Sequence, residues 1–315
     1  MQLPAELRQA YESVLSETPV RALTEAAERL SLRYRQVEAA SVYIQTDAER
    51  LAYLAMRLPA TYAAAHRVFS ELQQRVPSLA PRSLLDLGAG SGAATWAAQE
   101  VFSDLQQCTL FEQDRALIAL GQRLASHWQK AHWQVTDLRQ NGLLPTHDVV
   151  IASYSLGELA EAQAVQVALR AWQAVAQALV LIEPGTMRGF GLLRKLRDAL
   201  IAQGAHLFAP CPHAQACPLT SDDWCHFAAR VERTALQRRL KAGALNYEDE
   251  KFAYLIFTRE PHQRATSRVL RHPQRQAGLT QLQLCTPDGL QSASINKRDK
   301  EAWRRARKTA WGDEW

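Results

Sequence analysis

Three glycines at alternate positions follow a short apolar stretch near residue 85. They are Gly88, Gly90 and Gly92, and a helical run over residues 93–102 comes next. A strand, a glycine turn and a helix form the edge of a doubly wound sheet at which phosphates or nucleosides bind. Glycine permits the sharp turn and lets a ligand approach the backbone, while the helix N-terminus offers free N–H groups. The pattern therefore predicts a phosphate- or nucleoside-binding turn.

The residue near the end of the strand narrows the choice of ligand. Gly88-x-Gly90-x-x-Ala93 also fits the dinucleotide fingerprint, so an NAD(P)-dependent oxidoreductase is one alternative. Asp86 disfavours it, because the run Asp-Leu-Gly-Ala-Gly-Ser-Gly closely resembles the first motif of class I S-adenosylmethionine (SAM)-dependent methyltransferases. The resemblance implies SAM as the cofactor, with the loop around its methionine part. It also implies an α/β fold with a Rossmann-like doubly wound sheet.

Polar residues end or follow the next expected strands. Glu112 ends the second strand, and a carboxylate there accepts hydrogen bonds from both ribose hydroxyls. Asp137 follows a weaker third strand, where methyltransferases often place an acid near the adenine amine; a loop-capping aspartate is an equally good interpretation. Ser153 ends the fourth strand and faces the methyl-transfer position. The predicted cofactor-binding residues are Asp86, Gly88, Gly90, Gly92, Glu112, Asp137 and Ser153.

The turn that carries catalysis in many methyltransferases is missing. Residues 153–158 contain neither the Asn/Asp-Pro-Pro-aromatic turn of enzymes that methylate base amino groups nor the Pro-Cys nucleophile of cytosine C5 enzymes. No catalytic residue is therefore predicted. Two hypotheses remain open: a methyltransferase of unusual chemistry, or a protein that binds SAM without transferring a methyl group.

Four cysteines form a second set of residues that could do chemistry. Cys211, Cys217 and Cys225 are spaced by six and eight residues in a proline-rich stretch, and Cys285 follows at the end of a late strand. Four thiolates suit zinc or an iron–sulfur cluster. The close Cys-x-x-Cys pair of many zinc sites is absent, which favours the larger cluster; a buried loop with free thiols is the alternative. Cys108, inside an expected strand, is interpreted as a core residue.

Longer motifs connect these cysteines to one family. The matching segments are Cys211-x5-Cys217-Pro218 and residues 57–62, 183–186, 223–227, 247–254, 284–289 and 306–313. Together they resemble the mitochondrial small-ribosomal-subunit assembly factors of the methyltransferase-like class and their bacterial homologues. The resemblance implies that the four cysteines bind a four-iron four-sulfur (4Fe-4S) cluster, with zinc as the alternative occupant. It also implies that the protein acts on the small ribosomal subunit or its rRNA. A non-catalytic assembly factor that uses SAM and the cluster structurally is the alternative to a methyltransferase.

Positive charge gathers in the last third of the chain. Residues 1–225 carry 19 Lys and Arg against 22 Asp and Glu, whereas residues 226–315 carry 18 against 10. This asymmetry predicts an anionic partner, with nucleic acid the first candidate, although a solvated basic face would look the same. Seven basic residues near the C-terminus surround Trp303, whose ring could stack on unpaired bases together with the Arg planes. The predicted RNA-binding residues are Lys297, Arg298, Arg304, Arg305, Arg307 and Lys308.

The composition of the whole chain fits a globular protein outside the membrane. Of its 315 residues 47% are apolar, which is enough for a core, and no apolar run reaches the roughly 18 residues that span a membrane. The first residues lack the basic start and the apolar core of a signal peptide. We therefore predict a cytoplasmic protein without a membrane partner, and we favour a monomer.

Three regions are expected to position these residues. Residues 1–78, rich in helix formers, predict an N-terminal helical domain with helix starts at Thr18-Pro19 and Thr46-Asp47. The SAM-binding region is predicted over residues 79–260, and residues 261–315 carry late strands and the basic segment.

The expected strands alternate with helices, which is typical of a parallel sheet. A Cys-rich insertion is predicted after the fifth strand, at about residues 205–250. Residues 252–257 and 279–284 are expected to complete the sheet as an antiparallel pair. The five earlier strands are expected over residues 83–87, 108–111, 133–135, 148–153 and 178–182.

Overall fold

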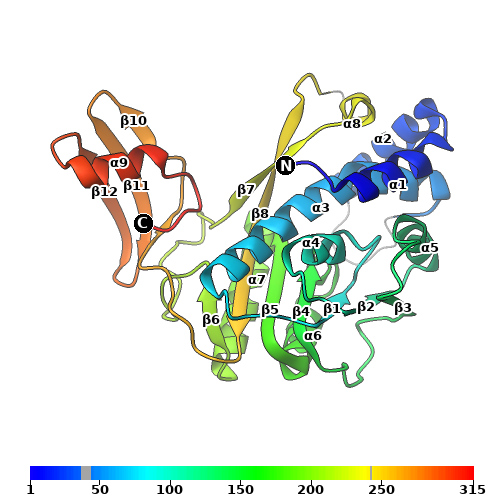
Figure 1. The fold of residues 1–315 in the computed structure, drawn as a ribbon, viewed down its shortest axis with the longest axis horizontal. Helices are drawn as coiled ribbons and strands as arrows, with labels where there is room; N and C mark the ends of the chain where they lie inside the picture. The colour runs from blue at the N-terminus through cyan, green and yellow to red at the C-terminus, as the bar shows by residue number, and fades with distance from the viewer. Residues whose placement is uncertain (37–43, 242) are drawn as a thin grey trace.

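A mixed eight-stranded sheet forms the centre of the chain, of which the computed structural model describes residues 1–36, 44–241 and 243–315 (Figure 1). The strand order is β3-β2-β1-β4-β5-β8-β6, with β7 also paired to β8. The first five strands are parallel, and β8 runs antiparallel to β5, β6 and β7. The strands are β1 (Ser83–Leu87), β2 (Gln107–Glu112), β3 (Ala131–Val135), β4 (His147–Ser153), β5 (Val175–Pro184), β6 (His206–Ala209), β7 (Phe227–Glu232) and β8 (Tyr247–Thr258). The predicted fold class, an α/β fold with a Rossmann-like doubly wound sheet, is confirmed.

Helices cover both faces of this sheet because its central strands are apolar on both sides. In β1, Leu84 packs into the core beneath α3 and α4, whereas Leu85 and Leu87 pack into the core beneath α6 and α7. The parallel strands bring their carboxyl ends to one edge, so the segments that follow β1, β2 and β4 lie near one another. The helices between the strands are α4 (Ala93–Val101), α5 (Arg115–Leu124), the short 3-10 helix η1 (Leu156–Glu158), α6 (Glu161–Ala174) and α7 (Met187–Ala202).

The N-terminal helices pack on the sheet. They are α1 (Ala5–Ser16), α2 (Val20–Gln36) and α3 (Asp47–Arg75). The predicted start at Thr46-Asp47 is confirmed, since the Thr46 side chain accepts the Glu49 N–H at 3.2 Å. Helix α2 begins one residue after Pro19. Helix α3 continues through the buried Pro59 and lies beside α4 (Figure 1). No helix in the described part of the chain is both long and apolar enough to cross a membrane.

A smaller antiparallel sheet carries the end of the chain (Figure 1, orange and red). It consists of β9 (Arg268–Val269), β10 (Gln274–Gln276), β11 (Leu279–Thr286) and β12 (Gly289–Asn296), and α9 (Lys300–Lys308) packs on it. The expected pairing of residues 252–257 with residues 279–284 is therefore wrong. In β11 the buried Leu282 and Leu284 alternate with the exposed Gln281 and Gln283, so up to Leu284 this strand buries one face only, against a helix. Strand β8 is apolar on both faces and belongs inside the main sheet.

Residues 205–250, where a Cys-rich insertion is expected, contribute two strands and the start of a third to the main sheet. Strands β6 and β7 both pair with β8, and α8 (Ala235–Leu240) follows β7. The loop over residues 210–226 and the segment with α8 lie outside these strands. Strand β6 ends before Pro210, which has no N–H to donate to a ladder.

Candidate functional sites

The glycine loop, residues 88–92, is shaped by left-handed backbone at each glycine. Gly88, Gly90 and Gly92 have φ of 74°, 56° and 83°. A Cβ at Gly88 would lie 2.5 Å from Ser155, whereas a Cβ at Gly90 would meet no heavy atom within 4 Å. The two positions therefore need glycine for different reasons: Gly88 because another segment packs on it, and Gly90 because its backbone faces open space that a ligand could fill.

Glu112 lies directly against this loop, because it ends β2, the parallel neighbour of β1. Its Oε2 accepts the Gly90 N–H at 2.9 Å, and its Oε1 accepts the N–H groups of Gln113 and Asp114 at 2.7 and 2.9 Å. Burial raises the pKa of the carboxyl, and these three donors oppose that rise. The structure thus brings Gly90 and Glu112 together at the carboxyl edge of the sheet.

Two buried carboxyl groups lie near the carboxyl ends of β1 and β5. Thr95 donates its hydroxyl to Asp86 Oδ2 at 2.7 Å, and burial raises the pKa of Asp86 to about 7. Glu183, near the end of β5, accepts the Gly157 N–H at 3.0 Å, and burial raises its pKa to about 8. Asp86 is therefore bound inside the protein by its own α4. Glu183 was not among the predicted site residues, although an acid at the end of a fifth parallel strand is a visible signal.

The two other predicted residues differ in their surroundings. Both oxygens of Asp137 are engaged by Arg139, at 2.7 to 3.0 Å, and this contact lowers the pKa of the aspartate. Asp137 also accepts the Arg139 N–H, so the geometry matches the loop-capping interpretation. Ser153 is buried at the end of β4, and its Oγ has no hydrogen-bond partner. Its hydroxyl is a buried polar group without a hydrogen-bond partner at the carboxyl end of β4.

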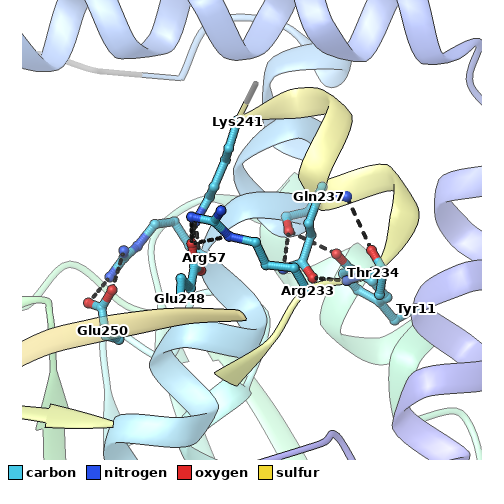
Figure 2. A network of polar contacts seen from close by, with 9 residues as sticks. Tyr11, Arg57, Arg233, Thr234, Gln237, Lys241, Glu248 and Glu250 are labelled. Atoms are coloured by element: carbon cyan, nitrogen blue, oxygen red, sulfur yellow. Dashed lines mark hydrogen bonds and ion pairs between the residues drawn. The ribbon is translucent and has the colours of Figure 1, made fainter. Parts of the chain in front are cut away.

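The loop after β4 is held by contacts that the sequence did not mark as functional. Tyr154 has a φ of 58°, which is unusual for a bulky residue, and donates its hydroxyl to Glu250 Oε1 at 2.8 Å. Arg57 of α3 binds both oxygens of Glu250, at 2.9 and 3.2 Å (Figure 2). The Arg57 guanidinium also lies 5.0 Å from the centroid of the Tyr154 ring. Helix α3 and strand β8 therefore restrain the segment that follows β4.

The four predicted cysteine ligands line one pocket, which we call the cysteine pocket. Cys211, Cys217 and Cys225 come from the loop between β6 and β7, and Cys285 comes from β11 of the second sheet. All four are free thiols in a wall that is mostly apolar and includes Leu219 and Leu270. Burial raises the pKa of Cys225 well above its usual value and that of Cys285 to about 12, and neighbouring cysteines raise both further.

The thiols of Cys225 and Cys285 therefore stay protonated unless a cation compensates their charge. Among the residues that the structure describes, no three His, Cys, Asp or Glu side chains are grouped so that they could hold a single metal ion.

Buried basic groups surround this pocket. Arg197, 3% exposed, donates to the carbonyl oxygens of His213 and Gln215, and its Nε–H has no hydrogen-bond partner. His213 places Nε2 3.7 Å from Cys285 Sγ, and its Nδ1 also lacks a partner. Arg268 binds Pro210 O, Gly312 O and the carboxylate of Glu71, which ties the cysteine loop to the C-terminal tail and to α3. Sequence reasoning missed Arg197 and Arg268, because no local pattern marks an arginine that becomes buried.

The basic segment is exposed as predicted, but its tryptophan is not. The capping residue Asp299 accepts the Ala302 N–H at 3.1 Å and starts α9. Trp303 is half-buried and packs against the second sheet with Ala306, so part of its ring is covered by the protein itself. Amphipathic spacing explains this, since positions 302, 303 and 306 fall on one face of the helix. The exposed basic residues of this segment are the predicted Lys297, Arg298, Arg304, Arg305, Arg307 and Lys308, and also Lys300.

Curated relatives of this chain carry mitochondrial ribosomal names. Over 295 residues it is 31% identical to the human "Ribosome assembly protein METTL17, mitochondrial", a match that covers 85% of this chain and 62% of the human protein. It is 26% identical over 220 residues to "Rsm22-cox11 tandem protein 2, mitochondrial" of Schizosaccharomyces pombe, covering 55% of this chain and 29% of that protein. The chain therefore spans less than two thirds of the length of these relatives.

Similar solved structures include methyltransferases. The N-methyltransferase NodS of Bradyrhizobium japonicum WM9 is 13% identical with a TM-score of 0.41, and the match covers 62% of this chain and 85% of NodS. Magnesium protoporphyrin IX methyltransferase of Synechocystis PCC 6803 is 14% identical with a TM-score of 0.42, covering 72% and 90%. Nothing about a ligand or a substrate follows from similarity at this level.

Residues 47–315, most of the chain, match the family described as "Mitochondrial small ribosomal subunit Rsm22". The chain belongs to this family.

Proposed function

We propose that this protein binds SAM at the glycine loop and takes part in assembly of the small ribosomal subunit through its C-terminal region. The observation that carries the SAM proposal is the contact between Gly90 and Glu112, beside backbone that faces open space. The carboxylate can exchange its backbone donors for ribose hydroxyls, as acids at this strand end do in nucleoside sites. Membership of the Rsm22 family and the ribosome-assembly name of the human relative support the second half of the proposal.

Gly90→Val tests the SAM site. The substitution places a branched side chain in the open space beside Gly90, and we expect SAM binding to be lost in titration calorimetry. Because valine is also strained at a φ of 56°, Gly204→Val is the matched control: Gly204 has a φ of 78° and an equally open surrounding. Wild-type affinity for SAM in Gly90→Val would contradict the proposal, and preferential binding of NAD by the wild type would replace it.

Methyl transfer is a separate question from SAM binding. The alternative, a non-catalytic factor that uses SAM structurally, is favoured by the restraint of Tyr154 by Arg57 and Glu250 and by the missing catalytic turn. Incubation with precursors of the small subunit and SAM carrying a labelled methyl group separates the two. Label in rRNA or protein identifies a methyltransferase, and bound SAM without any transferred label identifies the structural role.

We propose an iron–sulfur cluster as the occupant of the cysteine pocket. Three thiols of the loop over residues 210–226 and one of β11 line one cavity, and Arg197 and His213 leave buried polar atoms without partners beside them. A cluster held by four thiolates is anionic, so it would be stabilised by these basic groups. When bound, the cluster would supply a cross-link between the loop over residues 210–226 and β11, and an electron-transfer centre. Zinc is the alternative occupant, and metal and sulfide analysis of protein purified without oxygen distinguishes the two.

The exposed basic side chains of α9 are proposed to contact rRNA. Replacing Arg304, Arg305, Arg307 and Lys308 with Ala should weaken binding to small-subunit RNA and lower the slope of log affinity against log salt by about 3, since each phosphate contact releases about 0.7–0.9 of a counterion. As a control, Arg8→Ala with Arg21→Ala removes exposed charge from α1 and α2 and should leave the slope unchanged. An unchanged slope in the α9 variant would show that α9 is only a solvated face.

The cytoplasmic location and the monomeric state remain predictions.

A further inference from the structure

Arg197 is a buried guanidinium with one unused donor. It lies on α7 with 3% of its surface exposed, and it lines the cysteine pocket together with the four thiols. Its Nη1 donates to Asp198 at 2.8 Å, and its Nη2 donates to His213 O at 3.1 Å and to Gln215 O. Its Nε–H has no partner. Leaving a buried charged donor unpaired is unfavourable, so this arrangement indicates an acceptor that is bound in the pocket.

The contacts of Arg197 place that donor beside the cysteine loop. The carbonyl oxygens of His213 and Gln215 lie between Cys211 and Cys217, so the same side chain that fixes the course of this loop faces the pocket. The neighbouring Arg268 is different, because a carboxylate and two carbonyl oxygens take its donors. Among the described residues that line the pocket, Arg197 is the guanidinium with an unpartnered buried nitrogen.

We propose that Arg197 donates its Nε–H to a sulfur of the anionic group held by the four cysteines, and thereby raises the reduction potential of that group. This inference rests on the proposed cluster. A 4Fe-4S cluster with four thiolate ligands carries a net charge of 2−, and reduction by one electron makes it 3−. A hydrogen-bonded guanidinium stabilises the more negative state more strongly, so it favours the reduced form. In this role Arg197 contacts the cluster without ligating it, since the cysteines remain the ligands.

The test is a potentiometric titration, followed by electron paramagnetic resonance, of protein purified without oxygen. Arg197→Met removes the charge and the donor but keeps an apolar stem, and we expect its midpoint potential to be lower than that of the wild type. Arg197→Lys keeps the charge without Nε–H and should give an intermediate potential. Lys195→Met is the control, because Lys195 is on the same helix, is 56% exposed and pairs with Glu161 away from the pocket. Its potential should equal that of the wild type.

Each result decides the inference. A wild-type potential in loaded Arg197→Met overturns it, and if only Arg197→Lys loads, a wild-type potential there does the same. If neither variant retains iron but both keep the circular dichroism spectrum of the wild type, a direct contact between Arg197 and the cluster is supported. Loss of iron together with unfolding shows that Arg197 is needed for folding, and it overturns the inference. Wild-type protein without iron overturns the proposed cluster as well, whereas a loaded wild type with unshifted variants overturns this inference alone.

Discussion

The glycine loop and the cysteine pocket are assembled in opposite ways. The loop lies between neighbouring strands, with Gly90 and Glu112 only 22 positions apart. The Glu112 carboxylate is held there by backbone N–H groups. The pocket joins a loop that follows the main sheet's edge strand β6 to β11 of the second sheet, and its polar partners are buried arginine side chains. A local site of the first kind needs only its own strands to form. The second kind exists only when two sheets are docked, so its occupant would also stabilise that docking.

The largest expected effect comes from removing a cysteine of the pocket. Cys→Ser at Cys211, Cys217, Cys225 or Cys285 should abolish the iron and sulfide content and lower the unfolding temperature, because a structural metal site contributes folding free energy, on the order of 10 kcal/mol in the strongest cases. Subunit binding should weaken as well, since α9 packs on the sheet that carries Cys285.

Two observations separate this expectation from general damage. SAM affinity, measured below the unfolding temperature, should stay at the wild-type value, because the glycine loop does not depend on the pocket. Cys108→Ser should retain iron, since Cys108 lies in β2 with Gln99 as its partner. Stable Cys225→Ser protein with unchanged thermal unfolding would contradict a structural role for the pocket.

An intermediate effect is expected from Glu112→Gln at the loop. The variant keeps the size of the side chain but loses its charge, and its amide NH2 would face the backbone donors that the carboxylate now accepts. Hydrogen bonds to a charged group contribute roughly 1.5–3 kcal/mol, so SAM should bind about 10- to 100-fold more weakly in calorimetry. Iron content should not change. Glu100→Gln, at an exposed position of α4, is the control, and equal affinities of the two variants would remove Glu112 from the site.

The smallest effect concerns the pH dependence of stability. In ligand-free protein burial raises the pKa of Asp86 to about 7, above its value in the unfolded chain. Between the two pKa values the folded protein keeps a proton that the unfolded chain has released, so stability falls as the pH rises through this window. Asp86→Asn cannot titrate, and its free energy of unfolding should fall less between pH 5 and pH 8, by at most about 1.4 kcal/mol per pH unit. Urea unfolding at several pH values measures this, and identical slopes would show that Asp86 does not carry the dependence.

The sequence by itself determined the features that depend on neighbours along the chain. Alternate glycines after an apolar strand predict the loop, because left-handed turns and close backbone approach need glycine wherever the chain is placed. The apolar stretches of β1, β4 and β5 predict central parallel strands, and Thr46 predicts the start of α3. The acid at the end of β2 could be assigned to the loop because adjacent parallel strands end at one edge.

Only the tertiary structure decided which distant segments meet. Strand β11 has the length and composition to join either sheet, and burial of its alternate face against α9 placed it in the second. The same packing placed one side of Trp303 against the second sheet. The carboxylate of Asp137 accepts hydrogen bonds from Arg139, two residues away. Arginine is ordinarily exposed, so no pattern announces that Arg197 will be buried beside four thiols. Its burial follows from the docking of two sheets around a loop, which is a property of the whole molecule.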